Sequence, residues 1–162
     1  MAVMINAVSN GGNVYKPSIV KLSEPALVRK AAVKPETLEI VKDALSGVVN
    51  EPGGTGGAAR SNTVMIGGKT GTAQVVGIRK DSKNLKEAHR DHAWFVAFAP
   101  VEKPQVAVSV LVEHGGHGGS AAAPIAKLAI EAYMLPLDKK KELIGKPKDI
   151  SEEQKEVSHV QN

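Results

Sequence analysis

Four apolar side chains at the start of the chain recur at helical spacing: Met1, Met4, Ile5 and Val8. They predict a helix, and Asn10-Gly11-Gly12 supplies the residues that a left-handed helix cap needs. This helix begins at the first residue with no capping residue before it. We therefore expect the chain to be cut from a longer protein.

A second helix is predicted over residues 35 to 49. Pro35 fits its first position, and acidic residues complement the positive end of the helix dipole. The face expected to be buried carries Leu38, Val41, Leu45 and Val48. A glycine-rich loop over residues 50 to 57 follows, and two interpretations of it stay open: a border of a functional site, or a disordered linker between helix and strand.

Strand-like apolar runs follow over residues 63 to 76, 92 to 99 and 105 to 113. The last two are joined by a proline-flanked segment that suits an antiparallel hairpin. Both faces of the last strand are apolar, so we expect helices on both sides of the sheet. One such helix is predicted from Ser120, as its cap, to about Leu135, with a buried stripe of Ile125, Leu128, Ala129 and Ala132.

Together these elements predict an α+β fold in which helices cover an antiparallel sheet of at least three strands. A short extended segment over residues 13 to 22 is expected at an edge, because Pro17 cannot donate a ladder hydrogen bond. Residues 77 to 91 are polar and predict a solvated excursion. The domain is predicted over residues 1 to 135, and residues 136 to 162 are predicted to form a charged, mobile tail.

Composition narrows the classes of function. The 162 residues include no cysteine, which excludes a disulfide scaffold and a cysteine-ligated metal site. No apolar run approaches the roughly 18 residues of a membrane span. The net charge of +4 is spread over loops and tail, and aromatic residues make up only 3% of the chain, so we expect no nucleic-acid partner.

One segment carries candidate chemistry: residues 66 to 74, Ile-Gly-Gly-Lys-Thr-Gly-Thr-Ala-Gln, inside a predicted strand. Gly68-Lys69-Thr70 matches the end of a phosphate-binding loop. That motif requires a glycine where this chain has Thr63, and a helix where this chain continues as a strand. The favoured interpretation is the K-T-G element of active-site serine transpeptidases and serine β-lactamases.

This interpretation gives each residue a chemical task. Cationic Lys69 attracts a substrate carboxylate and eases proton movement at a serine, and the hydroxyls of Thr70 and Thr72 can hydrogen-bond that carboxylate. Gly71 lets an acyl-donor peptide lie against the strand, and the backbone N–H of Thr72 points at the developing oxyanion. Strict alternation places Lys69 and Thr70 on opposite faces, so both serve one site only at the rim of a twisted edge strand.

The surroundings of this element strengthen the assignment. Residues 67 to 74, Asp-His-Ala-Trp-Phe-Val-Ala-Phe-Ala-Pro at 91 to 100, and Pro-Gln-Val-Ala-Val-Ser-Val at 104 to 110 closely resemble the end of the transpeptidase domain of class B penicillin-binding proteins. Residues 4 to 12 and His-Gly-Gly at 114 to 116 fit the same pattern. The resemblance covers about residues 1 to 135, and the tail has no counterpart.

The resemblance implies a penicillin-binding protein or serine β-lactamase-like fold. It also implies a peptidoglycan D,D-transpeptidase that cross-links stem peptides ending in D-Ala-D-Ala through an acyl-serine, and that β-lactams acylate. The parent protein would lie at the periplasmic face of the bacterial inner membrane with the cell-wall elongation machinery.

In this family the nucleophile motif S-x-x-K and the motif S-x-N lie upstream of K-T-G, so here they would precede Met1. We interpret Ser18 with Lys21, in an extended segment, and Ser82-Lys83-Asn84 as chance matches. The chain therefore has one of the three catalytic motifs, and we expect it to be inactive alone.

A second hypothesis from a different class stays open: a noncatalytic α+β binding or regulatory module with a transpeptidase-like shape. His114 and His117 lie beside glycines and predict a surface turn rather than a metal site, and His92 predicts a structural hydrogen-bonding residue. We expect no metal and no cofactor. If part of the fold is missing, exposed helix faces should make the chain self-associate.

Overall fold

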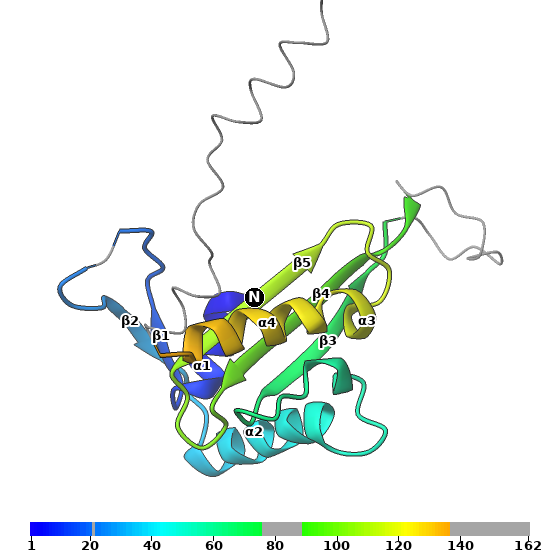
Figure 1. Ribbon diagram of the computed structural model, residues 1–162. Helices are drawn as coiled ribbons and strands as arrows, with labels where there is room; N and C mark the ends of the chain where they lie inside the picture. Colours follow the sequence, from blue (N-terminus) through cyan, green and yellow to red (C-terminus); the bar gives the residue numbers. More distant parts are fainter. Residues whose placement is uncertain (21, 76–88, 137–162) are drawn as a thin grey trace, which may run out of the picture.

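Both helices and strands occur in the computed structural model, which describes residues 1–20, 22–75 and 89–136 (Figure 1). The elements in order are α1 (Ala2–Ser9), β1 (Asn13–Tyr15), β2 (Leu27–Lys30), α2 (Pro35–Asn50), η1 (Gly57–Ala59), β3 (Gly67–Ala73), β4 (His92–Ala99), β5 (Val106–Val112), α3 (Gly118–Ala121) and α4 (Ala123–Met134). The predicted tail over residues 137 to 162, and most of the predicted polar excursion, lie outside the described residues.

A three-stranded antiparallel sheet in the order β3-β4-β5 forms the centre of the fold. Gly67 pairs with Phe98 at one end of the β3–β4 ladder and Ala73 pairs with His92 at the other. The expected hairpin of β4 and β5 is confirmed. The strand predicted from residue 63 begins only at Gly67, and the carbonyl of Ile66 just before it accepts a 2.9 Å hydrogen bond from the Asn50 side chain of α2.

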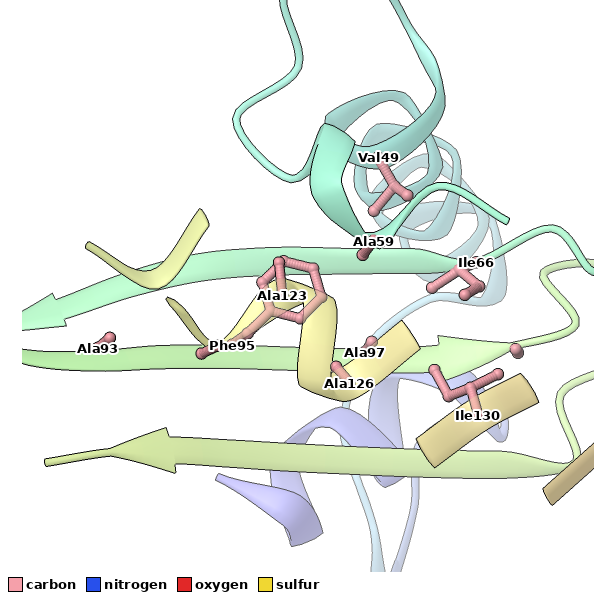
Figure 2. Close-up of a cluster of buried hydrophobic side chains, with 11 residues drawn as sticks. Val49, Ala59, Ile66, Ala93, Phe95, Ala97, Ala123, Ala126 and Ile130 are labelled. Atoms are coloured by element: carbon pink, nitrogen blue, oxygen red, sulfur yellow. The ribbon is translucent and has the colours of Figure 1, made fainter. Parts of the chain in front are cut away.

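Alternate residues of β4 face two separate buried clusters. Phe95 and Ala97 point into a cluster that α4 and η1 cover (Figure 2). Val96 and Phe98 point to the opposite face, where Ile5 of α1 packs against them. Figure 1 shows α4 and α1 on opposite sides of the sheet and α2 next to β3. The α+β architecture with helices on both faces is thus confirmed.

The N-terminal helix and the helix over residues 35 to 50 have the predicted positions. Gly11 and Gly12 have φ of 83° and 94°, and the Gly12 N–H donates to Ala7 O at 2.8 Å, as a left-handed cap requires. The buried face of α2 differs in part from the prediction. Val41 is exposed, while Val49 and the aliphatic stem of Lys42 are buried.

The last helix differs from the prediction in both its start and its buried face. Two helices replace the expected one, and Ser120 lies inside α3 rather than at a cap. The residues of α4 that face the sheet are Ala123, Ala126 and Ile130. Ile125 and Leu128 of the predicted stripe are 46% and 65% exposed. The small side chains of Ala123 and Ala126 let the helix approach the alanine-rich face of β4, and Ile125 and Leu128 lie on its opposite, exposed face.

The strand β2 was not predicted. Residues 13 to 22 were expected as one extended edge segment, but β1 ends at Tyr15 and pairs antiparallel with β2. All four residues of β2 are exposed, so this strand has no buried face to leave an alternating pattern in the sequence.

The burial of α4 gives a direct stability test. We expect Ile130→Ala to destabilise the chain by about 2–5 kcal/mol, because it opens a cavity in the main cluster. The matched variant Leu128→Ala on the exposed face should change stability by no more than about 0.5 kcal/mol. Urea unfolding followed by circular dichroism measures both, and a larger loss for Leu128→Ala contradicts the observed face.

Candidate functional site

The lysine and the threonine of K-T-G meet at the outer edge of β3. Lys69 is exposed, and its Nζ donates to Thr70 O at 3.1 Å and to Thr70 Oγ1 at 3.3 Å. Strand alternation alone would separate these side chains. The long aliphatic stem of Lys69 brings its ammonium group back to Thr70, because β3 is an outer strand of its sheet. Thr72 follows two residues later, is also exposed, and pairs with Ala93.

The glycine before the motif makes room for an aromatic ring. A Cβ atom at Gly68 would lie 2.8 Å from both the Phe95 ring and the Val96 carbonyl oxygen. The sequence suggested that glycines in this strand permit close approach of another backbone. The structure shows both: the Val96 carbonyl is such a backbone group, and the ring of Phe95, which is fully buried, comes equally close.

A second segment reaches the site from the glycine-rich loop. The Oγ1 atoms of Thr55 and Thr70 lie 3.2 Å apart, although 15 residues separate them in the sequence. The Gly56 N–H donates to Val48 O at 2.9 Å, and the Arg60 guanidinium donates to Asn50 O at 2.6 Å, so the loop is fixed to the end of α2. Of the two interpretations, the loop is thus an ordered border of the site.

A third segment, the start of α3, packs directly on the strand. A Cβ atom at Gly118 would lie 2.1 Å from Trp94 O and 2.6 Å from Gly71 O, and one at Gly119 would lie 2.5 Å from Thr55 O. Only residues without side chains can come this close. The sequence singled out neither Thr55 nor these two glycines, since their contacts are with residues far away along the chain.

His92 and His114 contact each other near the ends of β4 and β5. The backbone N–H of His114, which has φ of 54°, donates to His92 Nδ1 at 2.9 Å, and the two rings lie 4.7 Å apart. This confirms the hydrogen-bonding prediction for His92. The carbonyl of His117 accepts from the Ser120 hydroxyl at 3.1 Å. Within residues 1–20, 22–75 and 89–136, no three His, Cys, Asp or Glu side chains group as metal ligands would.

The other partial motif matches do not join the site. The Ser18 hydroxyl donates to Val20 O at 2.7 Å in a segment without helical structure, whereas S-x-x-K needs a helical turn. Lys21 and the Ser82-Lys83-Asn84 match lie outside the described residues. None of the helices in the described part of the chain has the length and apolar character needed to cross a lipid bilayer.

Comparison with known proteins identifies relatives of this chain. The model of the penicillin binding protein transpeptidase domain matches residues 1–131. The peptidoglycan D,D-transpeptidase MrdA of Haemophilus influenzae is 33% identical over 168 residues, which cover 92% of this chain and 26% of the relative. The chain thus spans about a quarter of the length of this curated relative.

Solved structures share the fold. A complex between penicillin-binding protein PBP2 and MreC from Helicobacter pylori has a TM-score of 0.60 and 29% identity, over 82% of this chain and 24% of that one. The penicillin G acyl-enzyme complex of penicillin-binding protein A from M. tuberculosis has a TM-score of 0.61 and 29% identity, over 83% of this chain and 31% of that one.

The contact of α3 with β3 and β4 can be tested by a substitution that adds one methyl group. We expect Gly118→Ala to destabilise the chain by about 1–3 kcal/mol or more, because the new Cβ meets the Trp94 carbonyl and the backbone must move. Gly57→Ala is the matched control, since nothing lies within 4 Å of its Cβ position. Equal unfolding midpoints for the two variants in urea would contradict the close contact.

Proposed function

The chain belongs to the penicillin-binding protein transpeptidase family, and from this premise we propose that it is the K-T-G-bearing part of a peptidoglycan D,D-transpeptidase. The observation that carries the proposal is the meeting of Lys69 and Thr70 on an exposed strand edge, with Thr55 beside them. The Lys69 ammonium group and the Thr70 hydroxyl at one place form a binding site suited to a carboxylate.

The proposed reaction has two steps. A serine hydroxyl attacks the carbonyl of the D-Ala-D-Ala bond, its proton passes to the departing amine, and terminal D-Ala leaves. An amine of a second stem peptide then attacks the acyl-serine ester, and the serine regains a proton. The nucleophilic serine and the S-x-N motif come from a part of the protein outside these 162 residues.

Each residue of the strand has a proposed role in that reaction. Lys69 and the hydroxyls of Thr70 and Thr72 hold the substrate carboxylate, and Lys69 also eases proton movement at the serine. The outer edge of β3 accepts the extended acyl-donor peptide as an added strand, next to Gly71. The N–H of Thr72 donates to the oxyanion of the tetrahedral intermediate.

Partners and location are proposed from the relatives. The penicillin G acyl-enzyme of the M. tuberculosis protein supports β-lactams as ligands, and the Helicobacter pylori complex with MreC supports a protein partner, which we propose belongs to the cell-wall elongation machinery. We place the parent protein at the periplasmic face of the inner membrane. Exposed apolar side chains on the outer faces of α1 and α2, including Met4 and Ile40, support self-association of the isolated chain.

The role of Lys69 can be tested in the complete transpeptidase that carries this segment. We expect Lys69→Ala to lower the rate constant of acylation by penicillin G about 100-fold or more, because a positioned cation is lost from the site. Lys103→Ala, at an exposed lysine between β4 and β5, is the control and should retain the normal rate. Full acylation of Lys69→Ala would favour the noncatalytic module instead.

The chain of 162 residues provides a complementary test. Incubated with excess penicillin G, it should show no covalent adduct by intact mass, because its own S-x-x-K match is not helical in the residues described. A stoichiometric adduct would mean that this chain contains its own nucleophile.

A further inference from the structure

Thr55 contacts Thr70, whose hydroxyl oxygen also accepts a hydrogen bond from Lys69 in the K-T-G strand. The Thr70 hydroxyl oxygen has two lone pairs and one proton. The Lys69 ammonium group can only donate, so its 3.3 Å hydrogen bond occupies one lone pair of Thr70 Oγ1. If the Thr55 hydroxyl, 3.2 Å away, donates to the second lone pair, the Thr70 proton must point away from both donors.

The position of Thr55 is fixed by its neighbours. On one side the Gly56 N–H is bonded to Val48 O of α2 at 2.9 Å. On the other side Gly119 of α3 lies so close to the Thr55 carbonyl that a Cβ atom there would come within 2.5 Å of it. The loop that presents the Thr55 hydroxyl is therefore held between two helices, and the hydroxyl has a defined direction towards Thr70.

We infer that Thr55 is a positioning residue for carboxylate recognition: it donates to Thr70 Oγ1 and so directs the Thr70 proton to the substrate carboxylate. This inference rests on the proposed function, in which Thr70 binds that carboxylate. Thr55 acts through Thr70 and touches no reacting atom. Its loss therefore weakens recognition of the negative charge more than the chemical step.

The experiment uses the complete transpeptidase with two probes, penicillin G and its methyl ester, which lacks the carboxylate charge. Thr55→Val removes the hydroxyl at nearly constant shape. We expect it to lower the second-order rate constant for penicillin G about two- to tenfold, the worth of one hydrogen bond, and to leave the rate constant for the ester unchanged. Thr55→Ser keeps a hydroxyl and should restore the rate with penicillin G.

Thr63→Val is a matched control. Thr63 is another exposed threonine, and its Oγ1 lies 2.9 Å from Ser61 Oγ, away from K-T-G. It should leave both rate constants unchanged. Equal losses with penicillin G and with the ester in Thr55→Val would assign a purely structural role and overturn the inference, as would an unchanged rate with both probes.

Lys69→Ala, measured in parallel, distinguishes a failure of the inference about Thr55 from a failure of the proposed function. If Lys69→Ala abolishes acylation while Thr55→Val is acylated as fast as the unsubstituted protein, the inference about Thr55 is wrong and the proposed function stands. If Lys69→Ala is also acylated as fast as the unsubstituted protein, the proposed function itself is wrong.

Discussion

The close approach of α3 to β3 and β4 is the contact on which the arrangement of the site depends. At Gly118 the backbones of α3, β3 and β4 meet. A side chain at this position would collide with the carbonyl oxygens of Trp94 and Gly71. The next residue, Gly119, then lies against Thr55, which in turn lies beside the Thr70 hydroxyl. This backbone contact, together with the hydrogen bonds that fix the loop to the end of α2, holds the glycine-rich loop beside the strand.

A side chain of the buried core, Phe95, contacts both the strand and the loop that form this site. The Phe95 ring is fully buried, and it lies close to Gly68 of β3 and to Gly56 of the loop, whose Cβ positions would be 2.8 Å and 3.2 Å from ring atoms. The strand and the loop therefore rest on one rigid aromatic side chain. Because interiors are close-packed, a change in that ring is transmitted to both segments. The same packing that stabilises the sheet also positions the polar groups at its edge.

The parts of the structure that the sequence predicted well are those determined by neighbours along the chain. The helix starting at Pro35, the glycine cap after α1 and the β4–β5 hairpin each follow from local spacing and turn residues. The errors concern contacts between distant segments. The buried face of α4 depends on how closely it packs on β4, and the contact of Thr55 with Thr70 joins the glycine-rich loop to strand β3. The K-T-G motif identified the strand from the sequence. The residues that lie beside it, such as Thr55 and Gly118, could be identified only from the tertiary structure.

A strand edge that binds a peptide is also an edge that can pair with another protein. In the part of the chain that the structure describes, β4 is the only strand paired with β3, so backbone groups on its other side could accept an extended chain. Natural sheets discourage such pairing with charged side chains, especially lysine, at the edge. Lys69 satisfies this requirement at the position where the proposed substrate must bind. Its ammonium group opposes pairing with a neutral strand and favours a chain that carries a carboxylate, so the residue that protects the edge can also select the ligand.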